Sequence, residues 1–501
     1  MKISKHNSPC LAILGTGSDV GKSIVVTALC RYLVQQGMRV APFKAQNMSN
    51  NSGVTPEGLE MGRAQIVQAE AAGIAPLVDM NPVLLKPTSE IGSQVVVLGK
   101  VSENSTASDY HAKKETLFKT AAAALSRLAR QYELIVLEGA GSCAEVNLMD
   151  SDIVNLRMAA YVQAPVILVA DIHRGGVFAQ IVGTLACLEQ GQRDMVKGFI
   201  INRFRGDIRL FKDGIDWIER QTGKKVFGVL PWYDHIHIEP EDSVVIERPR
   251  RIHAVEDDRP SIAVIRLPHI SNFNDFEPLA AIKDLSVLFL EETQDLSQFR
   301  AVILPGSKNT RFDLQWLHKS GWSEKIKRFV DLGGHVLGIC GGYQMLGSRV
   351  HDPDGTEGRP GSTQGLNLLP VETELKAPKV TTLTKFSRQE ADGAGYEIHM
   401  GQTRRTGGAP LFQVSERNHT PICDDDGCVS PDFKRMGTYI HGMFDNAAIT
   451  RFWLQQIGLP NIEVSKLDGL EARNKEYDLL AEHFAKYIDV KGIMRLVRNN
   501  S

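Results

Sequence analysis

The sequence lacks the features that would place a protein in a membrane or outside the cell. None of its apolar runs approaches the roughly 20 residues that a helix needs to cross a bilayer. Its first ten residues, MKISKHNSPC, lack the long apolar core of a signal peptide. Its 7 cysteines are too few and too scattered for a disulfide framework, and an odd number is typical of reduced thiols. We therefore expect a cytoplasmic protein that does not bind a membrane.

An excess of charge of either sign is also missing. The chain has 57 Lys and Arg residues against 59 Asp and Glu residues, a formal net charge of −2. Nucleic acids attract strongly basic surfaces, so we expect no nucleic-acid partner. Cys423 and Cys428 have no second Cys/His pair to accompany them, which argues against a zinc site.

Short apolar runs alternate with helical patterns over the first half of the chain. The runs are nearly unbroken by polar residues, as is typical of strands covered on both faces. They span residues 11–15, 39–44, 133–141, 165–172, 196–204 and 225–232. Helix-like stretches at 23–36 and 115–130 lie between some of them. This alternation predicts an α/β fold with a parallel, doubly wound sheet.

The pattern breaks once and then resumes. Residues 236–261 are charged and contain three prolines, which indicates a linker. Strand-like runs return at 262–268, 286–290, 299–307 and 333–340, followed by shorter strands and turns over 365–440. We therefore expect a first domain over 8–235, a second α/β domain with some antiparallel strands over 262–450, and a helical tail over 451–501 that packs on the second domain.

The first predicted strand runs into GTGSDVGKS at residues 15–23, which opens a helix. A glycine-rich turn before a helix directs backbone N–H groups at a phosphate. Lys22 is placed to reach the β- and γ-phosphates of ATP, and Ser23 to bind Mg²⁺. The usual spacing is altered, because Thr16 stands where a glycine is expected. An ordinary glycine-rich turn is the alternative, but the strand–turn–helix context favours a nucleotide site, with candidate residues Thr16, Gly17, Gly21, Lys22 and Ser23.

Other polar residues follow neighbouring strands, and ligands in open α/β sheets bind beyond the carboxyl ends of strands. Glu138 follows four apolar residues, which suits a second Mg²⁺ contact, with a structural salt bridge as the alternative. Further candidates for binding substrate or phosphate are Lys44, Gln46, Asn47, Asp171 and Arg174. Asp171 and Arg174 could equally bind each other.

A second candidate site lies in LGICGGYQMLG, residues 337–347. A lone cysteine is usually a small buried apolar residue. Cys340, however, separates a strand from a helix among glycines, as does the nucleophile of a strand-to-helix elbow. A helix N-terminus favours the thiolate. The N–H groups of Gly341 and of Gly306, in LPGSKN, could form an oxyanion hole.

A thiol nucleophile needs a proton-transfer partner. His441 in GTYIHGMF follows a short apolar strand and precedes a glycine, so it could reach a neighbouring strand end. His399 in GYEIHMG is the main rival. Taken singly, each histidine could be structural.

The two sites together resemble a known family. GICGGYQMLG followed about 100 residues later by GTYIHGMF resembles class I glutamine amidotransferase domains, and the N-terminal half is similar to the dethiobiotin synthetase family of P-loop enzymes. With FKAQNMSNNS, GFIINRFRGD and the stretch 70–100, the chain resembles the cobyric acid synthase family over about residues 10 to 450.

The resemblance implies a reaction. It implies ATP- and glutamine-dependent amidation of the b, d, e and g carboxylates of a corrin, adenosylcobyrinic acid a,c-diamide, with Mg²⁺. It also assigns the attack on glutamine to Cys340 and proton transfer to His441. Two alternatives stay open: amidation of the a and c carboxylates, and a nucleotide-dependent binding or switch protein with an inactive amidotransferase domain. KAQNMS and NPVLLKPTS resemble the cobyric acid branch, and intact Lys22, Cys340 and His441 argue against inactivity.

The chain departs from the family pattern at three positions. Met443 stands where many class I amidotransferases have a glutamate that orients the histidine, so we expect a Cys–His dyad in which another group holds His441. His173 replaces a residue that is more often acidic, which leaves its role undefined. Cys143 stands where the family commonly has proline, and we interpret it as a tolerated small residue.

Overall fold

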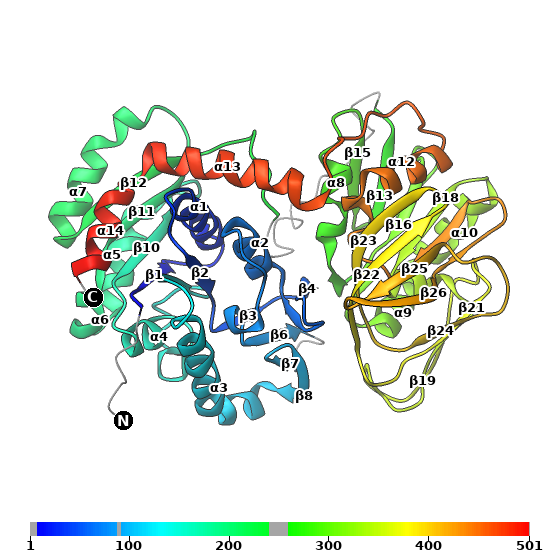
Figure 1. The fold of residues 1–501 in the computed structure, drawn as a ribbon, viewed down its shortest axis with the longest axis horizontal. Helices are drawn as coiled ribbons and strands as arrows, with labels where there is room; N and C mark the ends of the chain where they lie inside the picture. The colour runs from blue at the N-terminus through cyan, green and yellow to red at the C-terminus, as the bar shows by residue number, and fades with distance from the viewer. Residues whose placement is uncertain (1–7, 88–91, 240–258, 500–501) are drawn as a thin grey trace.

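The computed structural model describes residues 8–87, 92–239 and 259–499, which form two α/β domains that lie side by side (Figure 1). Most of the predicted linker, residues 240–258, falls outside the described residues. Among the helices of the described ranges, none is both long enough and apolar enough to cross a membrane.

The first domain is built on a six-stranded sheet with the order β12-β11-β10-β1-β9-β2, and all neighbours are parallel. The strands are β1 (Cys10–Gly15), β2 (Val40–Phe43), β9 (Leu134–Glu138), β10 (Val166–Asp171), β11 (Val196–Phe204) and β12 (Lys225–Pro231). Each coincides with one of the six apolar runs. The prediction of a parallel, doubly wound sheet is confirmed.

Helices cover both faces of this sheet. One face packs against α3 (Ala107–Leu128), α4 (Leu156–Tyr161), α5 (Val177–Cys187) and α7 (Lys212–Thr222). The other packs against α1 (Lys22–Gln35). Because both faces are covered, the strands are apolar throughout their length rather than alternating.

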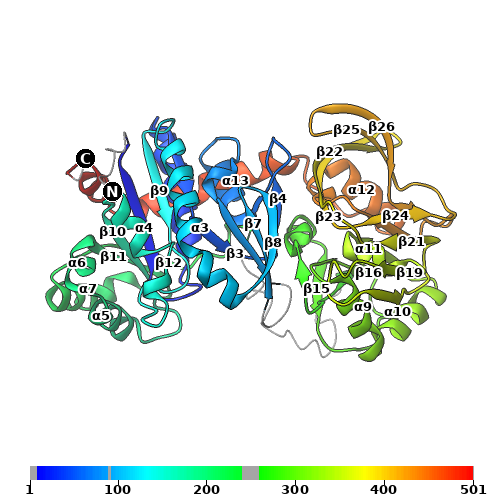
Figure 2. The ribbon, with the colours of Figure 1, turned by 90° about the horizontal axis from the view of Figure 1, so that it is seen from below.

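A smaller part of the first domain extends toward the second domain (Figure 2). It contains the sheet β3-β6-β7-β8 and the hairpin β4–β5. The strands are β3 (Gln46–Met48), β4 (Ser52–Val54), β5 (Glu60–Gly62), β6 (Val83–Pro87), β7 (Gly92–Val97) and β8 (Lys100–Thr106). Val54 of β4 packs with Tyr396 and Ile398 of the second domain, so the domains share an apolar contact here.

The second domain has a sheet with the order β15-β13-β16-β18-β28-β27. The parallel strands β13 (Ser261–Ile265), β15 (Ser286–Leu290), β16 (Ala301–Leu304), β18 (His335–Ile339) and β28 (Arg435–Thr438) form its body, and β27 (Cys428–Val429) pairs antiparallel at one edge. A wholly antiparallel sheet, β23-β22-β25-β26, contains β22 (Val380–Arg388), β23 (Ala391–His399), β25 (Phe412–Arg417) and β26 (Thr420–Asp426). The prediction of mixed strands in this domain is confirmed.

The expectation that the whole tail packs on the second domain is wrong. Only its first part does so, through α12 (Ala447–Gln456) and the apolar residues up to Val464. The helices α13 (Gly469–Tyr487) and α14 (Val490–Asn499) return to the first domain, where α13 covers α1 and α14 packs beside β12 (Figure 1). The reason is apolar packing: Leu480 and Phe484 of α13 and Ile493 and Val497 of α14 join the same buried cluster as α1. Polar residues between these positions concealed the pattern in the sequence.

This packing predicts the effect of a single truncation in α13. Phe484 is 1% exposed, so Phe484→Ala should lower the stability of the first domain by about 3–5 kcal/mol. The matched control is Leu479→Ala in the same helix, because Leu479 is 39% exposed. Urea unfolding of both variants measures the difference, and an equal loss in the two would contradict the assignment of α13 to the first-domain core.

Candidate active site

The loop between β1 and α1 forms a cradle at the carboxyl end of β1. Gly21 adopts φ 95°, which favours glycine, and a Cβ there would lie 2.1 Å from the Asn202 amide nitrogen. The Lys22 ammonium donates to the carbonyl oxygens of Gly17 at 2.9 Å and Gly141 at 2.8 Å. Thr16 begins the loop and donates its N–H to the Val169 carbonyl at 3.0 Å. The loop thus has the backbone shape and the cation that phosphate binding requires.

Three predicted residues meet beside this loop. Glu138 Oε1 accepts a hydrogen bond from Ser23 Oγ at 2.9 Å and pairs with Lys44 Nζ at 2.9 Å. Gln68 donates to the other carboxylate oxygen, and Glu138 is 1% exposed. Glu138 therefore takes part in a salt bridge, one of its two predicted roles, while lying against the hydroxyl proposed to bind Mg²⁺.

A cavity of about 380 Å³ opens next to Lys22 and Lys44. Gln46 and Asn47 line it, as predicted for groups at the end of β2. Its other polar lining residues include Ser18, Asp19, Lys114, Asp152 and Asn155. The cavity is large enough for part of a nucleotide or a substrate carboxylate arm.

Asp171 and Arg174 bind separate partners rather than each other. Asp171 pairs with Arg203 at 2.9 Å, and Arg174 pairs with Asp19 at 3.3 Å. Arg203 also binds Asp19 at 2.8 Å, so one network connects all four side chains beside the P-loop. The sequence analysis missed Arg203, although it too lies at a strand end, in GFIINRFRGD.

Two residues that depart from the family pattern, Cys143 and His173, lie in the first domain. Cys143 is buried in the first-domain core, and burial raises the pKa of its thiol to about 12. The His173 ring lies 5.2 Å from that of Trp232.

The second site begins at a sharp turn between β18 and α11 (Gly341–Leu346). Cys340 occupies this turn with φ 53° and ψ −110°, a strained conformation for a residue with a side chain. A Cβ on Gly342 would lie 2.0 Å from the Leu304 carbonyl oxygen, and one on Gly341 would lie 2.8 Å from the Ser307 nitrogen. The glycines therefore allow the end of β16 to approach the thiol turn, which brings the Gly306–Ser307 backbone beside Gly341.

His441 is held by a carboxylate that the sequence analysis did not identify. Its Nδ1 lies 2.7 Å from Asp275 Oδ2, and Asp275 Oδ1 accepts the N–H of Gly442 at 3.0 Å. His441 and Asp275 are 1% and 4% exposed. The Tyr396 ring stacks on the imidazole at 5.2 Å. The expected Cys–His pair thus has a third member, which substitutes for the glutamate missing at Met443.

The charge of His441 follows from this setting. Burial alone would lower the pKa of His441, but the Asp275 carboxylate and the hydrogen bond and charge of Cys340 raise it to about 10. The imidazole is therefore protonated at neutral pH.

His399, the rival base, has different neighbours. Its ring stacks on Tyr439 at 3.7 Å, and its Nε2 lies 3.5 Å from Glu397 Oε2. Burial lowers the pKa of His399. It lines the cavity of about 40 Å³ that contains Cys340, whose thiol donates to the Ile398 carbonyl at 3.4 Å and contributes to the raised pKa of His441. The geometry favours His441 as the proton-transfer partner.

Four segments that follow strands form this site. Asp275 lies in the turn Phe273–Phe276 after the short strand β14 (Ile270–Ser271), and Gly306 begins the short strand β17 (Gly306–Ser307) just beyond β16. Cys340 and His441 follow β18 and β28. The available signal for Asp275 was its place in SNFNDFEPL, where a carboxylate lies between two buried phenylalanines just after a strand. Burying such a group without a function is costly.

The first domain also reaches the thiol cavity. Lys86 of β6 lines it, and Glu60 of β5 pairs with Lys86 at 2.7 Å and with Lys379 of the second domain at 2.6 Å. Ser52 donates its N–H to the Asn272 side chain at 3.0 Å. A buried polar interface thus separates the two sites.

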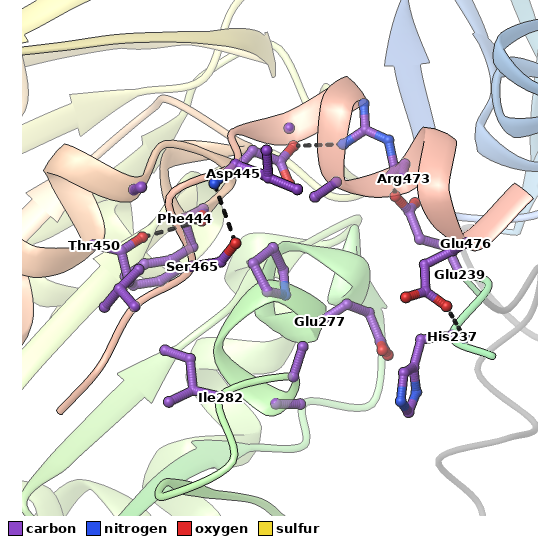
Figure 3. A pocket seen from close by; sticks show the side chains of 18 of the residues that line it. His237, Glu239, Glu277, Ile282, Phe444, Asp445, Thr450, Ser465, Arg473 and Glu476 are labelled. Carbon is purple, nitrogen blue, oxygen red and sulfur yellow. Dashed lines mark hydrogen bonds and ion pairs between the residues drawn. The ribbon is translucent and has the colours of Figure 1, made fainter. Parts of the chain in front are cut away.

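An interdomain cavity of about 350 Å³ is lined by residues of α8 (Glu277–Ala280), α12 and α13 (Figure 3). Arg473 of α13 binds Asp445 at 3.2 Å there and Glu70 of the first domain at 2.8 Å. None of the predicted site residues lines this cavity. Its contacts tie α13 to both domains.

Comparison with known proteins gives matches over nearly the whole chain. Residues 11–244 match the CobQ/CobB/MinD/ParA nucleotide binding domain, and residues 261–449 match the CobB/CobQ-like glutamine amidotransferase domain. A cobyric acid synthase of Chlorobium phaeobacteroides strain BS1 is 51% identical over 97% of this chain and 99% of its own length. One from Pelodictyon phaeoclathratiforme is 47% identical over 99% and 98%. A crystal structure of a glutamine amidotransferase aligns with 39% of this chain and 98% of its own, at 17% identity and a TM-score of 0.29.

The Asp275–His441 pair predicts a pH dependence of stability. Because the pKa of His441 is raised from 6.5 to about 10, the pair stabilises the fold fully below pH 6.5, and this stability is lost as pH rises toward 10. In Asp275→Asn the pKa should fall back toward 6.5 and the pH-dependent loss should disappear. NMR titration of the His441 ring with urea unfolding at pH 6.5 and 9.5 tests this. An unchanged His441 pKa in the variant would refute it.

Proposed function

Because the chain belongs to the cobyric acid synthase family, we propose that it amidates the b, d, e and g carboxylates of adenosylcobyrinic acid a,c-diamide, using glutamine and ATP. The protein is an amidotransferase ligase of two domains, one nucleotide-binding and one glutamine-hydrolysing. The proposal of glutamine-dependent amidation rests on one observation. The chain holds a P-loop and also a buried arrangement of Cys340, His441 and Asp275.

In the glutaminase half, the Cys340 thiolate attacks the side-chain amide carbon of glutamine. The N–H groups of Gly306 and Gly341 stabilise the oxyanion, and the His441 imidazolium donates the proton that lets ammonia leave. Water then attacks the glutamyl thioester, with His441 accepting its proton, and glutamate departs as the thiolate returns. Asp275 acts through His441 by fixing its ring and supporting its charge.

In the synthetase half, a corrin carboxylate oxygen attacks the γ-phosphorus of ATP, and ADP leaves. Ammonia then attacks the carbonyl carbon of the acyl phosphate, and inorganic phosphate leaves. The P-loop N–H groups and Lys22 hold the phosphates, while Lys44, Gln46 and Asn47 line the adjacent cavity where the carboxylate arm would enter. Asp171, Arg174 and Arg203 border the same loop and are candidates for positioning the nucleotide.

The residues beside the P-loop suit Mg²⁺. Ser23 Oγ and Glu138 offer the oxygen ligands that this ion prefers, and phosphate oxygens and water would complete its shell. Bound there, Mg²⁺ would neutralise charge on the transferring phosphate. Lys44, which pairs with Glu138, supplies a second positive charge at the same edge.

Free ammonia is mostly ammonium at neutral pH and is then not nucleophilic. Ammonia must therefore pass between the two sites along a route that is shielded from water. The interface formed by Glu60, Lys86 and Lys379 lies on the thiol cavity and is almost fully buried, which supports direct transfer between the domains.

The corrin specificity is tested by offering each substrate to the purified enzyme with ATP, Mg²⁺ and glutamine. Mass spectrometry of the products should show four successive additions to adenosylcobyrinic acid a,c-diamide. Turnover of cobyrinic acid but not of its a,c-diamide would overturn the proposal in favour of the a- and c-amidating activity. ATP binding without any corrin product would favour the switch protein.

The role of Cys340 is tested by Cys340→Ala. Glutamine-driven synthesis should fall by at least about 10³-fold, because the nucleophile is lost, while synthesis from a high ammonia concentration should survive. Cys187→Ala is the control, since Cys187 is exposed at the end of α5 and lines neither candidate site cavity. Undiminished use of glutamine by the Cys340 variant would show that another residue attacks glutamine.

A further inference from the structure

The cavity at Cys340 contains an ammonium group that none of the steps above uses. Lys308 follows Gly306 and Ser307 in the turn after β16, and its N–H donates to the His269 carbonyl at 2.9 Å. Its side chain lines the cavity together with Cys340 and Gln344. The turn that supplies a predicted oxyanion donor therefore also places a lysine beside the thiol.

Three lysines line this cavity, and they differ in their partners. Lys86 and Lys379 share the Glu60 carboxylate at 2.7 and 2.6 Å. Lys308 makes no side-chain hydrogen bond or ion pair with any other residue in the described part of the chain. Burial lowers the pKa of Lys308, the charge of Lys86 lowers it further, and the charge of Glu357 opposes this change. Lys308 is half-buried, so its ammonium is accessible from the cavity to an anionic ligand.

The carboxylate of Glu357 lines the same cavity and carries the opposite charge to Lys308. Glu357 accepts the N–H of Arg311 at 3.2 Å but forms no ion pair within the described ranges. Burial raises the pKa of Glu357 to about 7, and the charge of Lys308 opposes that rise. The two groups therefore act on each other through space without being in contact. One cavity thus offers a cation and an anion, each without an ion-pair partner, beside a nucleophilic thiol.

A free α-amino acid carries the matching pair of charges. We propose that Lys308 binds the α-carboxylate of glutamine and Glu357 its α-ammonium, which positions the side-chain amide at Cys340. This inference rests on the proposed glutaminase activity and adds the residues that select free glutamine. Such a site discriminates against amides that lack either charged group, because the corresponding side chain is then left buried and unpaired.

The test compares glutamine with two truncated amides in the full-length enzyme, with ATP, Mg²⁺ and corrin present. 4-Aminobutanamide lacks the α-carboxylate, and 5-amino-5-oxopentanoate lacks the α-amino group. For Lys308→Met we expect kcat/KM for glutamine to fall about 10- to 100-fold, mainly through KM, with little change for 4-aminobutanamide. For Glu357→Gln the same loss should apply to glutamine and to 4-aminobutanamide, but not to 5-amino-5-oxopentanoate.

Controls separate binding from folding. Lys308→Arg keeps the charge and should recover part of the glutamine activity. Lys319→Met, at the exposed end of the helix α9 (Thr310–Lys319), should behave as wild type. Synthesis from ammonia should be unchanged in every variant.

Two results, both in Lys308→Met, would overturn the inference. One is an unchanged KM for glutamine. The other is an equal loss of kcat/KM for glutamine and for 4-aminobutanamide, which would indicate a structural role for Lys308. Failure of the wild-type enzyme to release ammonia from glutamine would instead overturn the proposed function, and this inference with it.

Discussion

The contact between Asp275 and His441 is the interaction on which the glutaminase site depends. Both side chains are buried, so neither charge is stable there without the other. Asp275 also holds the backbone of Gly442, which fixes the turn that carries the imidazole. The turn that carries Cys340 is strained, and it places the thiol in the same site as the imidazole that Asp275 fixes.

A second constraint comes from the interface between the domains. The first domain contributes Glu60 and Lys86 to the edge of the thiol cavity, and the second domain contributes Lys379, which pairs with Glu60. The cavity is therefore completed only when the two domains are together. The two domains therefore share a buried polar boundary beside the thiol cavity.

The strands and both reactive sites could be predicted from the sequence because their signals are local. Buried parallel strands are continuous apolar runs, and the groups around Lys22, Glu138, Cys340 and His441 stand where those runs end. The other contacts join segments far apart in the chain. Asp275 and His441 are 166 residues apart, and Glu60 and Lys379 are 319 apart, so no local pattern connects them. The tail was misplaced for the same reason: its apolar positions match a helix face formed by residues 22–35.

The return of α13 and α14 has a consequence for how the protein is made. The first domain is discontinuous in the chain, since residues 469–499 complete its outer layer after the entire second domain has been translated. Ribosomal synthesis proceeds from the N-terminus, so the sheet that carries the P-loop emerges long before its cover does. The amidotransferase domain can finish folding first. A nascent chain therefore passes through a stage in which α1 exposes an apolar surface, and this is the stage at which a chaperone would have most to protect.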